Sequence, residues 1–357
     1  MRLCLLTLTL WLVGCASTPP PEKPFVPPAY PPPPEEPRFI YEMTLRNSRQ
    51  VTLDPKQARL RYLLTGEVQQ GISFAKPFDV AVCQGRVFVS DTVLRRVLVF
   101  DFPGARFFEI GLKEPGMMQK PLGLATDNAC NLYVADGTQG RVHVYDQDGG
   151  FQRTIGGPKQ FNRLSHVAVD AEGTHLFTVD TGGVTTQEHR VRVFNARTGE
   201  HLYDFGGRGK EAGQLNLPQD LVVGRDGNVY VVDGGNFRVQ VFRPDGTFLR
   251  SFGSAGAQFG QFSRPKGIAA DKQGNVYVVD TAFGNFQIFD PEGKLLLFIG
   301  DRSTTDGPGK YMLPAGIDVD EDGRVYFVDQ FFAKVEVYRP AGLATEAGYL
   351  AARRQPK

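Results

Sequence analysis

Residues 217–253 read LPQDLVVGRDGNVYVVDGGNFRVQVFRPDGTFLRSFG, and residues 264–300 read RPKGIAADKQGNVYVVDTAFGNFQIFDPEGKLLLFIG. Each segment holds, in order, a short apolar stretch, a turn, an alternating run that ends in Asp, a second alternating run, another turn and a last stretch that closes on Gly. Alternation of apolar and polar residues between Gly, Asn and Asp is typical of short β-strands. Each segment therefore predicts four antiparallel strands.

The same unit recurs from Lys76 to Pro340, and successive units start 43 to 54 residues apart. A period of about 40 to 50 residues with four strands per unit is typical of β-propellers, because each sheet has two apolar faces that only neighbouring blades can cover. We therefore predict an all-β fold, a six-bladed β-propeller of four-stranded antiparallel blades within residues 38–340. The six repeats span 76–111, 120–156, 163–206, 217–253, 264–300 and 313–340.

The predicted second strands carry a signature that ends in Asp, for example LYVAD at 132–136 and VYVVD at 229–233 and 276–280. A run of the type Asn-x-Arg-Val-x-Val-Phe follows in several units. The units resemble NHL repeats, and this resemblance implies the same six-bladed fold. Asn285 and Lys334 depart from the pattern, because they stand where other units have Arg.

The aspartates that end the second strands are present in every unit. A residue needed in every blade is better explained as a turn-former, whose carboxylate accepts backbone N–H bonds or pairs with the following Arg, than as a metal ligand. We expect this role for Asp91, Asp136, Asp180, Asp233, Asp280 and Asp329.

The sixth unit ends at Pro340 without a fourth strand, which would leave an open sheet edge. Residues 59–66 (RLRYLLTG) precede the first unit at about the distance expected of an outer strand. We therefore predict that this N-terminal segment closes the ring. Residues 38–53 are expected to add a peripheral strand, and residues 341–357 to form a tail.

The N-terminus has the pattern of an export signal, with Arg2 before an apolar run at 3–13 that is too short to cross a bilayer as a helix. Leu12-Val13-Gly14-Cys15 resembles the lipobox of bacterial lipoproteins. This resemblance implies removal of residues 1–14, lipidation of Cys15 and a lipid-anchored protein of the bacterial cell envelope. The outer membrane is favoured, because no Asp follows Cys15.

Eleven prolines lie within residues 16–37. Such a composition favours an extended polyproline chain, so residues 15–37 are predicted to be a lipidated tether. Two cysteines, Cys83 and Cys130, remain for the folded region. Export permits their oxidation, but the sequence leaves both a disulfide and a pair of free buried thiols open.

The charge balance of 40 Lys and Arg against 39 Asp and Glu gives a formal net charge of +1. No strong global field therefore recruits nucleic acid, and we expect no nucleic-acid partner.

In each unit, the residue two positions after the anchor (Pro77 in the first unit, Leu164 in the third and Pro218 in the fourth) should lie at one mouth of the central channel. Glycine is common there, but Asp79, His166 and Asp220 replace it in three units. Imidazole and carboxylate groups together could bind one divalent metal; the alternative is a set of solvated polar residues at a loop end. Asp318 is also unusual, because the equivalent positions in the other units carry Ala or Val.

Aromatic residues occupy the loops between second and third strands, on the face that should also carry the long connections 206–217 and 253–264. Aromatic residues beside adaptable loops suit a contact surface, although packing between blades is an alternative for each ring. The candidates are Phe237, Phe283, Phe331 and Phe332.

Two functional hypotheses follow. The favoured one is a monomeric, non-catalytic scaffold without a cofactor that binds another envelope protein or an extracellular polymer. The second is an envelope lyase or hydrolase with a divalent metal at the channel mouth. Fold alone does not choose between them.

Overall fold

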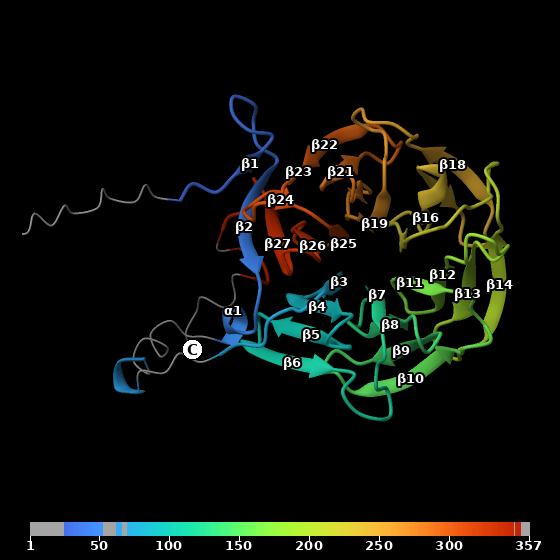
Figure 1. Cartoon of the computed structure of the whole chain (residues 1–357), viewed down its shortest axis with the longest axis horizontal. Coiled ribbons are helices and arrows are strands. Elements are labelled where there is room, and N and C mark those ends of the chain that lie inside the picture. The colour runs from blue at the N-terminus through green and yellow to red at the C-terminus, as the bar shows by residue number, and fades with distance from the viewer. Residues whose placement is uncertain (1–24, 53–61, 66–69, 346, 351–357) are drawn as a thin grey trace, which may run out of the picture.

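The computed structural model describes residues 25–52, 62–65, 70–345 and 347–350. Six antiparallel sheets form a closed ring around a central channel (Figure 1), which confirms the predicted all-β six-bladed propeller. The signal segment, Cys15 and the tether up to residue 24 lie outside the described residues. Within the described ranges, no helix combines the length and hydropathy needed to span a membrane.

Blades 1 to 5 each contain four strands in sequence order from the channel outward. Blade 1 holds β3 (Pro77–Cys83), β4 (Arg86–Asp91), β5 (Arg96–Asp101) and β6 (Arg106–Ile110). Blade 2 holds β7 (Pro121–Thr126), β8 (Leu132–Asp136), β9 (Arg141–Tyr145) and β10 (Phe151–Gly156). Blade 3 holds β11 (Leu164–Val169), β12 (His175–Asp180), β13 (Arg190–Asn195) and β14 (His201–Gly206).

Blade 4 holds β15 (Leu221–Val223), β16 (Val229–Asp233), β17 (Arg238–Phe242) and β18 (Phe248–Phe252), with the short 3-10 helix η1 (Gly234–Asn236) between its second and third strands. Blade 5 holds β19 (Pro265–Ala270), β20 (Val276–Asp280), β21 (Asn285–Phe289) and β22 (Leu295–Ile299). The connection to blade 6 contains the short parallel pair β23 (Asp301–Arg302) and β24 (Lys310–Tyr311).

Blade 6 is completed by the N-terminal region. Its own strands are β25 (Pro314–Val319), β26 (Val325–Asp329) and β27 (Lys334–Pro340). The outer edge of β27 pairs antiparallel with β2 (Phe39–Leu45), which in turn pairs with β1 (Ala29–Tyr30). A short helix, α1 (Arg49–Thr52), follows β2.

The ring is thus closed by an N-terminal strand, but the prediction that residues 59–66 supply it is wrong. Of that segment the structure describes Tyr62–Thr65, which form a helical turn with exposed Tyr62, Leu63 and Leu64. Three consecutive apolar residues cannot all face one side of a strand. In β2, by contrast, apolar and polar side chains partly alternate, and Leu45 is buried in the core between blades 6 and 1.

The core is divided among the blade interfaces. Six clusters of buried apolar side chains lie between successive blades, and one of them joins Val80 and Val82 of blade 1 to Tyr326 and Val328 of blade 6. The second strands of blades 2, 4, 5 and 6 are buried along their whole length, and those of blades 1 and 3 are buried after their first residue. The continuous apolar runs of the sequence therefore reflect sheets covered on both faces.

The repeated aspartates are turn-formers, as predicted. Asp280 is fully buried; its Oδ2 accepts the N–H groups of Ser263 and Arg264 at 2.7 and 3.0 Å, and its Oδ1 accepts those of Ala282 and Phe283. Asp91, Asp136 and Asp329 make the same four types of bond. These carboxylates fix the start of each blade against its second strand.

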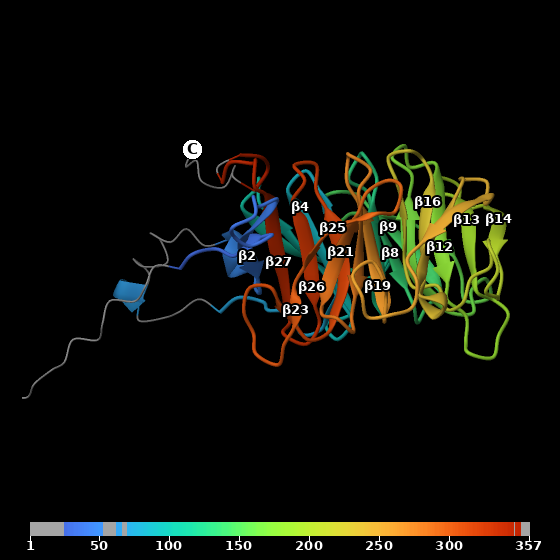
Figure 2. The ribbon, with the colours of Figure 1, turned by 90° about the horizontal axis from the view of Figure 1, so that it is seen from above.

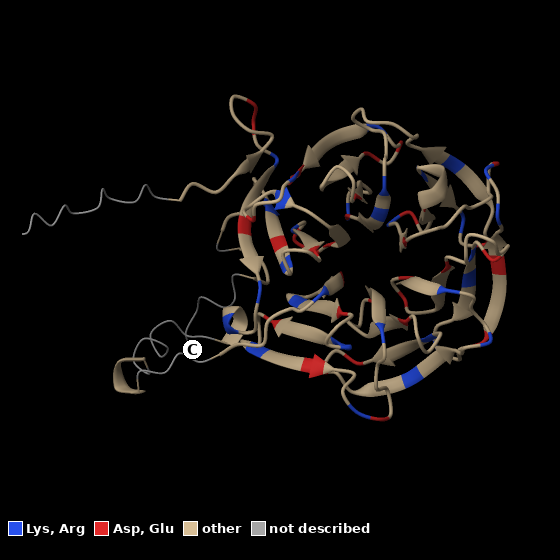
Figure 3. Cartoon of the chain, viewed as in Figure 1, with Lys and Arg blue, Asp and Glu red and all other residues tan. Residues whose placement is uncertain are grey.

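The two faces of the disc differ. One face, here called the loop-rich face, carries the blade connections and the turns between second and third strands. The other, the turn face, carries the turns between first and second strands and the C-terminal segment. In Figure 2 the C-terminal segment lies at the upper side of the disc and β23 at the lower side. Lys and Arg, and likewise Asp and Glu, are scattered over the ring of blades (Figure 3).

Cys83 and Cys130 form a disulfide, with their Cα atoms 5.6 Å apart. Cys83 ends the first strand of blade 1, and Cys130 lies in the turn before the second strand of blade 2. The bond joins the two blades at the turn face. Of the two states that the sequence left open, the structure adopts the oxidised one.

The closing strand carries a buried ion pair that tests its assignment. Glu42 Oε2 lies 2.7 Å from Nε of Arg324, whose side chain is fully buried. Glu42→Ala should lower the free energy of unfolding by about 3 kcal/mol, because the guanidinium loses its closest partner. Urea unfolding at pH 7 measures the loss. The control is Glu36→Ala, which removes an exposed carboxylate from the same segment and should change stability by less than about 0.5 kcal/mol. Equal effects of the two variants would contradict the assignment.

Candidate functional site

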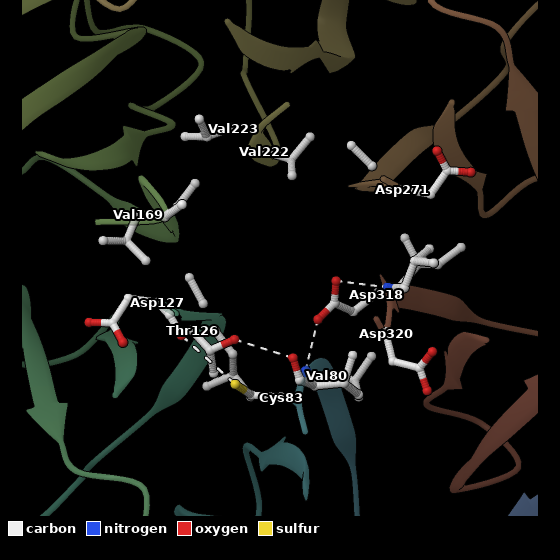
Figure 4. A pocket seen from close by; sticks show the side chains of 18 of the residues that line it. Val80, Cys83, Thr126, Asp127, Val169, Val222, Val223, Asp271, Asp318 and Asp320 are labelled. Atoms are coloured by element: carbon white, nitrogen blue, oxygen red, sulfur yellow. Dashed lines mark hydrogen bonds between the residues drawn. The ribbon is translucent and has the colours of Figure 1, made fainter. Parts of the chain in front are cut away.

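The central channel encloses a cavity of about 740 Å³ lined by the first strands of all six blades. Turn-face residues such as Gln84, Asn128 and Lys272 also line it, as does Tyr349 of the C-terminal segment, so the cavity reaches that face. Figure 4 shows Val169, Val222 and Val223 on one side and Asp318 on the other. The walls are therefore partly apolar, with carboxyl groups among them.

Three of these carboxyl groups connect neighbouring blades; Asp79 and Asp220 are 5% exposed, and Asp318 is partly buried. Asp79 Oδ2 accepts the N–H of Leu124 in blade 2 at 2.8 Å. Asp220 Oδ2 accepts the N–H of Ile268 in blade 5 at 3.0 Å. Asp318 Oδ2 accepts the N–H of Val82 in blade 1 at 2.8 Å, and its Oδ1 bonds to its own strand (Figure 4). Each group thus satisfies a backbone donor on the next blade, as a buried polar group requires.

Burial makes these carboxyl groups weak acids. It raises the pKa of Asp79 to about 7 and that of Asp318 to about 8, against the lowering effect of their backbone hydrogen bonds. Burial, followed by the charges of Asp79 and Asp318, raises the pKa of Asp220 well above its ordinary value. The channel therefore holds carboxylic acids that keep protons close to neutral pH.

His166 lies at the loop-rich end of the channel and is 4% exposed. Burial, and then the charge of Lys266, lowers the pKa of its imidazole to about 3. Its ring centroid lies 5.4 Å from that of Phe78, and within the described structure its Nδ1 has no hydrogen-bond partner. At neutral pH this imidazole is uncharged.

The structure does not bring Asp79, His166 and Asp220 together as a metal site. Asp79 and Asp220 line the cavity, but His166 is not among its lining residues. In the described part of the chain, no group of three or more His, Cys, Asp or Glu side chains is arranged to hold a metal ion. The reason is that each carboxylate is directed at the backbone of a neighbouring blade, while the imidazole packs against Phe78. These residues do not fit the predicted metal.

Sequence reasoning missed Lys266, a partly buried cation at the loop-rich end of the channel. Its Nζ lies 4.7 Å from the ring centroid of Phe78. Burial and the charges of Arg264 and Lys76 lower its pKa to about 8, although Asp79 and Asp220 act in the opposite direction. The available signal was a charged residue between Pro265 and Gly267 in an otherwise apolar strand.

The predicted aromatic surface is only partly exposed. Phe331 is 61% exposed and packs edge-to-face on Phe332, which lies beside the Lys334 ammonium. Phe237 packs against the core between blades 4 and 5, and Phe283 is half-buried. A residue not predicted, Phe259 in the connection 253–264, is 70% exposed.

Buried side chains of the third strands hold the long connections of the loop-rich face. Gln240 accepts the N–H of Gly213 at 3.0 Å and Gln287 accepts that of Gly260 at 2.8 Å; both also donate to a carbonyl of the same connection. In blade 6, Glu336 accepts the N–H of Gly309 at 3.0 Å and pairs with the buried ammonium of Lys334. The connections are therefore pre-organised rather than adaptable.

NHL repeats match residues 215–242 and 262–289, within blades 4 and 5. The chain is 36% identical over 83 residues to the E3 ubiquitin-protein ligase TRIM71 of Xenopus tropicalis. This alignment covers 22% of this chain and 10% of that protein. It is 26% identical over 148 residues to the protein brain tumor of Drosophila melanogaster. That alignment covers 40% of this chain and 13% of the fly protein. The chain thus aligns with roughly a tenth of the length of these relatives. It is a six-bladed β-propeller that contains NHL repeats.

Solved structures share this fold at low identity. A Bacteroides thetaiotaomicron protein of unknown function has a TM-score of 0.57 at 19% identity, with 74% of this chain and 70% of that chain covered. A streptogramin B lyase has a TM-score of 0.56 at 12% identity (75% and 95% covered). A gluconolactonase of Xanthomonas campestris has a TM-score of 0.55 at 17% identity (75% and 86% covered). At these identities the likeness shows the fold alone.

The raised pKa of Asp318 predicts a pH dependence of stability. The folded state keeps the Asp318 proton up to about pH 8, whereas the unfolded state loses it near pH 4. Stability should therefore fall as the pH rises from about 4 to 8, because the folded state binds more protons in that window. Asp318→Ala, which installs the residue type of the other blades, should reduce this fall by at least about 2 kcal/mol.

Urea unfolding at pH 5 and pH 8 measures the effect. The control is Asp148→Ala, because Asp148 is exposed and its pKa is lowered by Arg106. Equal pH dependence in the wild type and Asp318→Ala would show that Asp318 titrates normally.

Proposed function

We propose that the chain is a lipid-anchored protein of the bacterial cell envelope whose propeller binds another envelope protein or an extracellular polymer through its loop-rich face, without catalysis. The observation that carries this proposal is the pre-organised loop-rich face itself. Its connections are held by Gln240, Gln287 and Glu336, and it presents the exposed rings of Phe259 and Phe331. Fixed loops lower the entropy cost of binding, and exposed aromatic rings supply contact area. The propeller acts as a monomer, and nucleic acid is not its partner.

The proposed lipid anchor leaves the loop-rich face accessible to a partner. The N-terminal strands β1 and β2 lie at the outer edge of blade 6, so the chain leaves the ring at its rim (Figure 1). An extended polyproline segment between Cys15 and Ala29 would span about 40 Å. Such a tether keeps both faces of the disc clear of the lipid surface, with the outer membrane as the favoured location.

The anchor is tested by Cys15→Ser. The wild-type chain expressed in a bacterium should fractionate with membranes, because several acyl chains bury many CH₂ groups at about 0.8 kcal/mol each. The variant should lose the lipid and appear in the soluble envelope fraction or as uncleaved precursor. Mass spectrometry of the N-terminal peptide identifies the acyl groups. An unmodified Cys15 in the wild type would overturn the anchor.

The binding role is tested by Phe331→Ser in the full-length chain. After cross-linking in intact cells and purification, the wild type should carry a specific partner, and the variant should recover at least about tenfold less of it. The control is Leu249→Ser on the outer strand of blade 4, a partly exposed apolar residue away from the loop-rich face. Equal recovery from all three chains would contradict binding through this face.

One observation favours a second candidate, a lyase or hydrolase acting in the channel. Asp79 and Asp318 have pKa values of about 7 and 8 within the cavity, and a carboxylic acid that titrates near neutral pH can donate a proton to a leaving group. Asp318→Ala separates the two candidates, because it would abolish turnover in the channel and leave binding at the loop-rich face unchanged.

A further inference from the structure

Cations occupy one repeated position on the loop-rich face. The backbone N–H of this position bonds to the aspartate that ends the second strand of the same blade, which makes the position equivalent from blade to blade. In blades 1, 2, 3 and 5 the residue is a cation with an exposed side chain, and the N–H bonds run from Lys76 to Asp91, Lys120 to Asp136, Arg163 to Asp180 and Arg264 to Asp280.

These four residues directly precede the first strands, so they surround the loop-rich mouth of the channel. Phe78, His166 and Lys266 lie together at that mouth, where Lys266 Nζ sits over the Phe78 ring. We call Lys76, Lys120, Arg163, Arg264 and Lys266 the cationic ring. Three of its members act on one another, since Lys76 and Arg264 both lower the pKa of Lys266.

The cationic ring has no internal neutralisation. Across residues 25–52, 62–65, 70–345 and 347–350, its five side chains make neither an ion pair nor a hydrogen bond. Two cations at the start of third strands on the same face are paired, Arg96 with Glu109 and Arg238 with Asp233. The second-strand aspartates beneath the ring are fully buried and bonded to backbone N–H groups. Asp79 and Asp220, below the mouth, act on Lys266 without an ion pair, and their carboxyl oxygens accept backbone N–H groups of neighbouring blades.

Unpaired like charges held close together by a rigid scaffold repel one another and attract counter-charges. We propose that the cationic ring binds an anionic polysaccharide, whose carboxylate or phosphate groups contact cations of several blades at once. This deepens and rests on the proposed binding role of the loop-rich face. A polymer suits the arrangement because the cations belong to four blades around the channel, and one small anion cannot contact them all.

A polysaccharide also suits the mouth better than a nucleic acid does. Proteins that bind single-stranded nucleic acid stack the bases on free aromatic side chains. Phe78, the aromatic ring described beside Lys266, already contacts His166 and Lys266. The anionic groups, rather than bases, are therefore the features that the mouth recognises.

The test uses the full-length protein in detergent and measures binding by calorimetry at low and high salt. Polygalacturonate probes carboxylates, phosphorylated dextran probes phosphates, dextran is the neutral control and single-stranded RNA is the competing polyanion. We expect binding of polygalacturonate or phosphorylated dextran, and the polysaccharide that binds identifies the group recognised. The affinity should fall with salt, because exposed charges are screened within about 10 Å at 0.1 M ionic strength.

Two double variants of equal charge change locate the site. Lys76→Gln/Arg264→Gln should lower the affinity at least tenfold. Arg243→Gln/Lys294→Gln, which removes two exposed cations from the turn face, should change it less than twofold. The proposal would be overturned if both double variants lost affinity equally or if neither anionic polymer bound at low salt. It would also be overturned if dextran bound more tightly than the anionic polymers. RNA bound at least tenfold more tightly than both probes would overturn the polysaccharide assignment.

The outcomes separate this inference from the proposed function. If Phe331→Ser loses its cross-linked partner while no polyanion binds, the binding role stands and the cationic ring fails. If the ring binds a polyanion while Cys15 carries no lipid, the envelope anchor fails and the ring stands.

Discussion

The need to cover both apolar faces of every sheet governs this structure. The interface between blades 6 and 1 alone buries more than ten apolar side chains, among them Val80, Phe100, Tyr326 and Val337. Exposing them would cost about 2 kcal/mol each, which together exceeds the 5 to 15 kcal/mol by which a domain is usually stable. A ring left open at this point would therefore not remain folded.

Closure gives the N-terminal region its structural role. The last blade ends at β27 with a free edge, and β2 covers that edge while Glu42 pairs with the buried Arg324. The described N-terminal segment with β1 and β2 is thus part of the blade that joins the two ends of the ring. Any force on the anchor would act on the strand that closes the fold.

The repeat predicted the blades because its information is local. The turn aspartates and the alternating strands recur within every unit, and each bond they make lies within one blade. The closing strand was misplaced because distance along the chain and a loose likeness to other outer strands favoured residues 59–66. The alternation in residues 39–45 was the better signal, and its partner Arg324 lies far away in the sequence. The disulfide was equally undecidable, since its geometry depends on how two blades sit side by side.

The metal prediction failed for a related reason, and the glycines show why. A Cβ added at Gly316 would lie 2.1 Å from Oδ1 of Asp79 in the next blade, and one added at Gly123 would lie 2.5 Å from the Cα of His166. Glycine in one blade therefore makes room for a larger side chain in its neighbour. In the sequence, Asp79 and His166 stand out because other units have glycine at the same position. In the structure, each of these larger side chains packs against the glycine of a neighbouring blade. The polar residues of the channel connect blades, whereas the unpaired cations at its loop-rich mouth make no such connection. For this reason we expect a ligand at that face rather than in the channel.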